Sequence, residues 1–126
     1  MKILVVDDEI DVKDLFLQRF RKEIRSGEVS FNFAHSGESA LEYLGQHESE
    51  AVLILSDINM PGMTGLELLR QIRSHYLKPP PVVMMITAYG DDENRNKADE
   101  YGANDFLTKP LDFKDLKNKL FQSKEL

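Results

Sequence analysis

Short apolar segments alternate five times with amphipathic segments along this chain, and that alternation strongly limits how it can fold. The apolar segments are 3–6, 29–34, 52–55, 82–86 and 105–108. The first, third and fourth show no polar alternation, as is typical of strands covered on both faces. Because strands that alternate with helices form parallel sheets with helices on both faces, we predict an α/β fold with a doubly wound sheet.

The segments between the strands have the period and the capping residues of helices. Val12, Phe16, Phe20 and Ile24 recur at every fourth position, which places them on one face of a single first helix. Side chains that can cap a helix N-terminus precede the other four amphipathic segments, and a glycine follows the fourth helix. These residues are Ser36, Thr64 (with Glu67 in a capping box), Asp91, Asp112 and Gly102.

Length, charge and cysteine content further limit the classes of protein to which this chain can belong. The chain has 126 residues, 41% hydrophobic and 30% charged, which is typical of one globular domain. Its net charge of −6 argues against direct binding to nucleic acid or to an anionic membrane. The absence of cysteine excludes disulfides and cysteine-ligated zinc. The N-terminal apolar run stops at Asp7, too early for a signal peptide, so we expect a cytoplasmic protein.

Polar side chains follow four of the five predicted strands. In a parallel sheet the carboxyl ends of the strands share one edge, where such folds bind their ligands. These side chains are therefore expected to gather at one site. They are Asp7, Asp8, Glu9, Asp57, Thr87 and Lys109.

This combination predicts phosphoryl chemistry with a divalent cation. Neighbouring carboxylates repel one another unless one is protonated or a cation lies among them, and hard oxygen ligands favour Mg²⁺ or Mn²⁺. Such an ion typically binds carboxylates together with a phosphate oxygen. Lys109 and Thr87 can then contact the phosphoryl oxygens, and Asp57 is the carboxylate best placed as a nucleophile that becomes an aspartyl phosphate.

Each of these residues also has a simpler interpretation on its own. An Asp-Asp pair after a strand is most often a helix cap, and an aspartate before a Pro-Gly turn is most often a turn residue. A lysine before a proline is usually solvated. Only the joint placement at one sheet edge favours a functional site.

Four stretches together resemble the receiver domain of bacterial two-component response regulators. They are 3–9 (Ile-Leu-Val-Val-Asp-Asp-Glu), 56–65 (Ser-Asp-Ile-Asn-Met-Pro-Gly-Met-Thr-Gly), 86–89 (Ile-Thr-Ala-Tyr) and 102–110 (Gly-Ala-Asn-Asp-Phe-Leu-Thr-Lys-Pro). The resemblance implies a flavodoxin-like three-layer fold with strand order 2-1-3-4-5 and five helices. It also implies that residues 1–126 are one receiver domain.

The resemblance assigns a role to each site residue. It implies Asp57 as phosphoacceptor, a cis peptide bond before Pro110, and a switch that couples Thr87 to the aromatic Phe106. It places Asn59 and Tyr89 where receivers tune the rates of phosphorylation and hydrolysis. The implied Mg²⁺ ligands are Asp8 directly, Asp7 through water, Asp57, and Asn59 through its carbonyl, while Thr87 and Lys109 contact the phosphoryl group.

The resemblance further implies the partners. A sensor histidine kinase or a histidine phosphotransfer protein would dock near the first helix. An output partner or fused output domain would use the face formed by the helix after Asp91, the strand 105–108 and the helix after Asp112, with the chain as a monomer or a weak homodimer through that face. We expect a signalling module rather than a conventional enzyme.

Two other classes of protein share parts of this pattern. A haloacid-dehalogenase-like phosphatase also uses an aspartate nucleophile and Mg²⁺, but it needs a second carboxylate two residues later, where this chain has Asn59. A flavodoxin-like FMN carrier needs a Ser/Thr/Gly-rich phosphate loop after the first strand. Here that position holds Asp7, Asp8 and Glu9, which would repel a phosphate.

Overall fold

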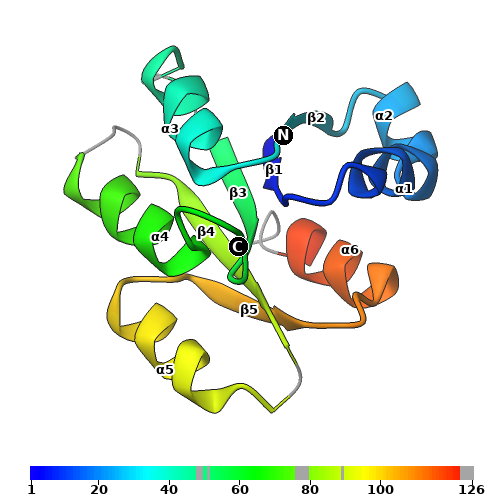
Figure 1. The fold of residues 1–126 in the computed structure, drawn as a ribbon. Helices are drawn as coiled ribbons and strands as arrows, with labels where there is room; N and C mark the ends of the chain where they lie inside the picture. The colour runs from blue at the N-terminus through cyan, green and yellow to red at the C-terminus, as the bar shows by residue number, and fades with distance from the viewer. Residues whose placement is uncertain (48–49, 51, 76–79, 89, 123–126) are drawn as a thin grey trace.

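The protein is a five-stranded parallel sheet between two layers of helices (Figure 1). The computed structural model describes residues 1–47, 50, 52–75, 80–88 and 90–122. All neighbouring strands pair in parallel, in the order β2-β1-β3-β4-β5, which confirms the predicted fold class and strand order. The strands are β1 (Lys2–Val6), β2 (Ser30–Ala34), β3 (Val52–Asp57), β4 (Val82–Thr87) and β5 (Asp105–Thr108).

The helices divide between the two faces of the sheet. One face packs against α1, α2 and α6, and the other packs against α3, α4 and α5 (Figure 1). Within the described ranges, no helix is both long and apolar enough to cross a membrane. The helices are α1 (Asp11–Arg19), α2 (Arg21–Arg25), α3 (Gly37–Gly45), α4 (Gly65–Ser74), α5 (Asp92–Glu100) and α6 (Phe113–Gln122).

The first helix is divided into two, so the described residues form six helices rather than the five expected. The division lies at Phe20, whose backbone torsions (φ −106°, ψ 18°) leave the helical range. Helical hydrogen bonds still run through it, since the Phe20 amide donates to Phe16 and the Ile24 amide donates to Phe20, both at 2.9 Å. Periodicity predicted the buried face correctly because that face is continuous, but it does not encode one residue's torsions.

The predicted capping residues are confirmed. Each side chain accepts a hydrogen bond from a backbone amide in the first turn of its helix. Gly102 follows α5 with a φ of +98°, a left-handed conformation that favours glycine. The caps are Ser36 (from Ser39, 3.1 Å), Thr64 (from Glu67, 3.2 Å), Asp91 (from Asn94, 3.3 Å) and Asp112 (from Lys114, 2.9 Å).

Two strands extend one or two residues further than the apolar pattern predicts. β3 continues through Ser56 to Asp57, and β4 continues to Thr87. All three residues are buried, because the sheet is covered on both faces at these positions. Asp57 and Thr87 are therefore held by rigid strand backbone rather than by loops.

Candidate functional site

Three carboxylates meet at the carboxyl ends of β1 and β3. Parallel pairing places Val6 opposite Ser56, so that Asp7 follows β1 directly beside Asp57 at the end of β3. Carboxylate oxygens of Asp7, Asp8 and Asp57 all lie within 4.8 Å of one another. Asp7 and Asp57 are buried, whereas Asp8 is exposed to solvent. The cluster therefore has two fixed members and one open side.

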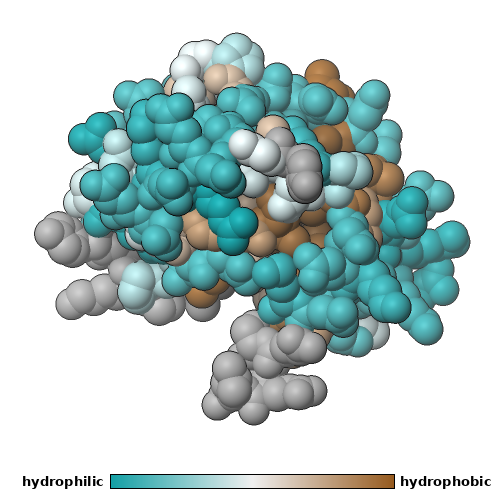
Figure 2. All heavy atoms as spheres, turned by 90° about the horizontal axis from the view of Figure 1, so that it is seen from below, coloured by the Kyte–Doolittle hydropathy of each residue, from teal (hydrophilic) through white to brown (hydrophobic). Residues whose placement is uncertain are grey.

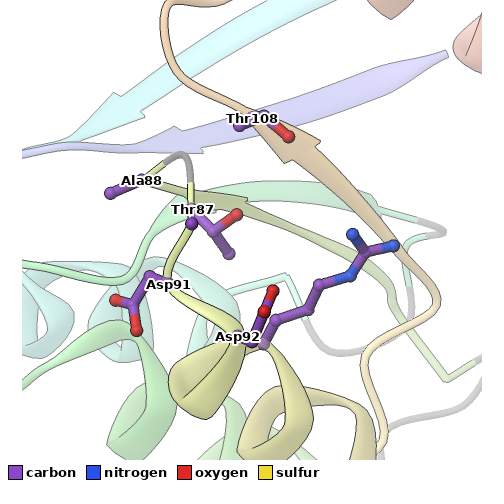
Figure 3. Close-up of a pocket in the computed structure, with 7 residues that line it drawn as sticks. Thr87, Ala88, Asp91, Asp92 and Thr108 are labelled. Carbon is purple, nitrogen blue, oxygen red and sulfur yellow. The ribbon is translucent and has the colours of Figure 1, made fainter.

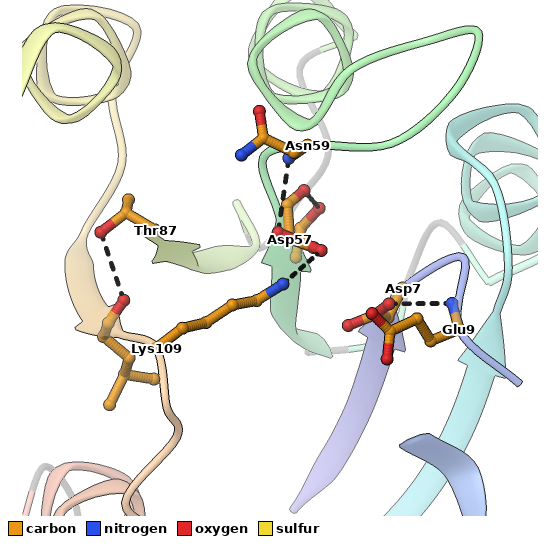
Figure 4. Close-up of polar contacts among 8 residues, drawn as sticks. Asp7, Glu9, Asp57, Asn59, Thr87 and Lys109 are labelled. Atoms are coloured by element: carbon orange, nitrogen blue, oxygen red, sulfur yellow. Dashed lines mark hydrogen bonds and ion pairs between the residues drawn. The ribbon is translucent and has the colours of Figure 1, made fainter. Parts of the chain in front are cut away.

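Lys109 reaches this cluster from the loop after β5. Its ammonium nitrogen lies 2.8 Å from Asp57 Oδ2 (Figure 4). Its backbone amide donates to the Thr87 carbonyl at 2.9 Å, and the Lys109–Pro110 peptide bond is cis, as expected. Partial burial acts to lower the pKa of Lys109, but the hydrogen bond and negative charge of Asp57 outweigh it and raise that pKa above its ordinary value. The lysine is therefore held as a cation.

Burial, together with the neighbouring carboxylates, shifts the pKa of Asp7. Burial is the main cause that raises the pKa of Asp7, and the neighbouring charge of Asp57 adds to it. The amide of Glu9, which donates to Asp7 Oδ1 at 2.9 Å, acts in the opposite direction. The folded protein thus disfavours the ionised form of Asp7. A hard divalent cation would relieve this, and an all-oxygen donor set of this kind fits Mg²⁺.

Gly65 fixes the loop that follows Asp57, and the sequence reasoning did not identify it. A Cβ at Gly65 would overlap the carbonyl oxygen of Asp57, and its amide donates to the Ile58 carbonyl at 2.8 Å. The loop is thereby pressed against the end of β3, where the Asn59 amide approaches Asp57 Oδ1 at 3.3 Å. The available signal was a glycine directly after a helix N-cap, where a helix former is expected.

Thr87 shares the sheet edge but faces away from the carboxylates. Its hydroxyl lies 3.5 Å from the Leu107 carbonyl, at the outer limit for a hydrogen bond (Figure 4). Phe106 on β5 is half-buried against the α3–α5 side of the core. Tyr89 lies outside the described residues. The structure therefore brings Asp7, Asp8, Asp57 and Lys109 together, with Asn59 adjacent through its amide.

Fold and site together define a doubly wound α/β protein. Its acidic pocket, paired with a lysine, lies at the edge formed by the carboxyl ends of the strands. The chain belongs to the family of response regulator receiver domains, whose family model it matches over residues 3–121. This confirms the resemblance, and the phosphatase and FMN-carrier alternatives find no support.

A curated relative and two solved structures show the same likeness. The response regulator RppA of Synechocystis sp. is 35% identical over 111 residues, which are 88% of this chain and 45% of RppA. A putative response regulator from Chloroflexus aurantiacus has a TM-score of 0.80 at 29% identity, covering 96% of this chain and 94% of that one. The Ssk1 receiver domain from Saccharomyces cerevisiae, co-crystallised with the histidine phosphotransfer protein Ypd1, has a TM-score of 0.80 at 25% identity, covering 94% and 85%.

Asp7→Asn is expected to raise the free energy of unfolding by about 1 kcal/mol at neutral pH without divalent cations, because it removes a buried charge that the fold disfavours. A raised pKa means that the folded state binds the proton more tightly, so the wild type gains stability as pH falls toward the ordinary value of 3.8. The advantage of the variant should therefore shrink with falling pH. Urea denaturation in a chelator at pH 7 and pH 4 measures this.

The control for this experiment is Asp99→Asn, at an exposed position on α5. It should change stability little at either pH. A variant at Asp7 that is less stable than wild type at pH 7, or equally more stable at both pH values, would contradict the electrostatic explanation.

Proposed function

We propose that Asp57 accepts a phosphoryl group from a phosphohistidine of a partner protein, and that the acidic cluster holds Mg²⁺ while it does so. The observation that carries this is the contact of Lys109 with Asp57 at 2.8 Å inside a group of three carboxylates within 4.8 Å. A buried nucleophile, a fixed cation and a site for a divalent ion are the parts that phosphoryl transfer needs.

The residues that would hold the ion are Asp7, Asp8 and Asp57, with the backbone carbonyl of Asn59. Mg²⁺ would supply positive charge to the phosphoryl oxygens and offset the mutual repulsion of the carboxylates. Mn²⁺ fits the same donor set. Asp8, the exposed member of the cluster, lies on the side from which an ion would enter.

In the transfer itself, a carboxylate oxygen of Asp57 forms a bond to phosphorus while the bond from phosphorus to the partner's imidazole nitrogen breaks. That nitrogen keeps the electron pair of the broken bond. The Asn59 amide at 3.3 Å orients Oδ1 of Asp57. Lys109 passes from the carboxylate to a phosphoryl oxygen, where its charge stabilises the transition state. The Thr87 hydroxyl turns from the Leu107 carbonyl to another phosphoryl oxygen.

The proposed switch follows from that last movement. When Thr87 turns toward the phosphoryl group, it leaves space behind it on the sheet face that also carries Phe106. A shift of the Phe106 ring would then alter the surface formed by α5, β5 and α6. That side of the molecule is mostly hydrophilic, with hydrophobic atoms exposed near its middle (Figure 2). We propose it as the output surface, and as the contact in any weak homodimer.

The partner that donates the phosphoryl group is proposed to dock beside α1. Ile10 and Leu15 are exposed there, at 74% and 40%. Leu15 also lines a pocket of about 230 Å³ that extends from Asp7 and Lys109 to Leu111. An apolar rim beside the acceptor suits a helix of a sensor histidine kinase or of a phosphotransfer protein, and the complex of the similar Ssk1 domain with Ypd1 supports this class of partner.

We propose that residues 1–126 form one receiver domain that acts in the cytoplasm as a signalling module, catalysing only its own phosphorylation and dephosphorylation. The chain spans less than half of the length of its relative RppA. We propose that its output is either a fused domain or a separate partner protein.

The test is phosphorylation with acetyl phosphate. The purified chain incubated with acetyl phosphate and Mg²⁺ is expected to gain the mass of one phosphoryl group, and a chelator should prevent the gain. Peptide mapping should place it on Asp57. An unchanged intact mass, or a phosphoryl group on any other residue, would refute the proposal.

A further inference from the structure

Arg95 covers the exposed side of Phe106. The guanidinium carbon of Arg95, on α5, lies 4.9 Å from the centre of the Phe106 ring. The other side of the ring packs against the hydrophobic cluster beneath α3, α4 and α5. The ring is thus held between apolar core and a cation, an arrangement in which the positive charge is attracted to the face of the ring.

Arg95 also lines a cavity at the carboxyl ends of β4 and β5. It has a volume of about 300 Å³ and is lined by Thr87, Ala88, Gly90, Asp91, Asp92, Arg95 and Thr108 (Figure 3). Thr108 is two residues after Phe106 on the same strand, so both side chains lie on one face of the sheet. Thr87 pairs with Thr108 across the strands. Thr87 therefore lies on one side of the cavity, and Arg95 lies on another side.

We propose that Arg95 is a latch that holds Phe106 out of this cavity when no phosphoryl group is present. The inference rests on the proposed function, because it takes Thr87 as the residue that moves on phosphorylation. A ring that enters the cavity leaves its place beneath the guanidinium, so the cation–π contact is made in only one of the two states. An interaction made in one state biases the equilibrium toward that state.

Because the cation–π contact is made in only one state, the direction in which loss of Arg95 changes ligand affinity can be derived. Removal of the guanidinium destabilises the state without a phosphoryl group and leaves the other unchanged. A ligand that binds the second state should then bind more tightly. Arg95 is exposed, so its contact should have the strength of cation–π pairs at exposed sites, which corresponds to a change of about two- to five-fold in affinity.

The experiment measures the dissociation constant of beryllofluoride, a stable mimic of the phosphoryl group, by calorimetry at saturating Mg²⁺. Arg95→Met keeps an unbranched apolar stem and removes the charge, and it is expected to lower the dissociation constant about two- to five-fold. Arg95→Lys restores a cation and should return the value toward wild type. In a Phe106→Leu background, which has no ring for the cation to cover, Arg95→Met should have no effect.

Arg70→Met is the matched control, because Arg70 covers the ring of Tyr101 at 5.5 Å in the same way but away from the cavity. It should leave the dissociation constant unchanged. An unchanged or raised dissociation constant in Arg95→Met, or the same decrease in the Phe106→Leu background, overturns the latch. Failure of the wild type to bind beryllofluoride overturns the proposed function and the latch together, so the two failures are distinguishable.

Discussion

Asp57→Ala is expected to incorporate no phosphoryl group from acetyl phosphate under conditions in which the wild type gains one. Asp57 is 3% exposed and is the carboxylate that Lys109 contacts. Alanine removes the nucleophilic oxygens, and neither Asp7 nor Asp8 has Lys109 hydrogen-bonded to it. Because the whole reaction depends on that one oxygen, the expected loss is complete rather than partial. Intact-mass spectrometry over a time course measures it.

The variant needs a demonstration that it is folded, because it also leaves Lys109 without its carboxylate. Circular dichroism and thermal unfolding with and without Mg²⁺ provide this. Asp99→Ala, which removes an exposed carboxylate from α5, is the matched control and should be phosphorylated at the wild-type rate. Phosphorylation of folded Asp57→Ala at the same stoichiometry would show that another residue is the acceptor.

Lys109→Ala is expected to slow phosphorylation by about 10²–10³-fold while leaving Asp57 in place. The lysine supplies a fixed positive charge where negative charge develops on the phosphoryl group, and loss of one such stabilising contact has an effect of that size. Lys109→Arg keeps a charge but replaces a compact ammonium by a planar fork, so only partial recovery is expected. Rate constants for acetyl phosphate at saturating Mg²⁺ measure both variants.

The chain offers a close control for this substitution at the opposite end of the sheet. Lys2 also contacts a carboxylate at 2.8 Å, that of Glu50, and its side chain is 33% exposed compared with 41% for Lys109. Lys2→Ala should cost only the small free energy of a surface ion pair and leave the phosphorylation rate unchanged. A decrease in rate for Lys109→Ala no greater than that for Lys2→Ala would assign Lys109 a structural role.

Hydrophobic patterns and capping residues predicted the strands and helices well, because each of these signals lies within a short segment of the chain. Uninterrupted apolar segments such as 52–55 are typical of strands covered on both faces, and Thr64 and Asp91 cap helices where their side chains can reach first-turn amides. The apolar pattern did not reveal that β3 continues to Asp57, because Ser56 and Asp57 are polar residues. Pairing with β1 and β4 supplies the backbone partners that hold Asp57 in the sheet.

The candidate site likewise contains residues that the sequence predicted and residues that it did not. The residue types after each strand were sufficient to select Asp7, Asp57 and Lys109 as neighbours, because parallel strands bring their carboxyl ends to one edge. Gly65 was missed, since its need for glycine comes from contact with the Asp57 carbonyl across the loop. The Arg95–Phe106 contact was missed for a related reason: the two residues are joined by packing of α5 on β5 and by no periodic pattern.

The order of amino acids was therefore enough to establish the α/β architecture and the group of residues at its functional edge, because hydrophobic periodicity, caps and strand direction are properties of short segments. The direction in which Thr87 points, the pKa of Asp7 and the cover over Phe106 depended on the folded molecule. Each of these arises from distances between segments far apart in the chain, and electrostatic and packing energies depend on those distances.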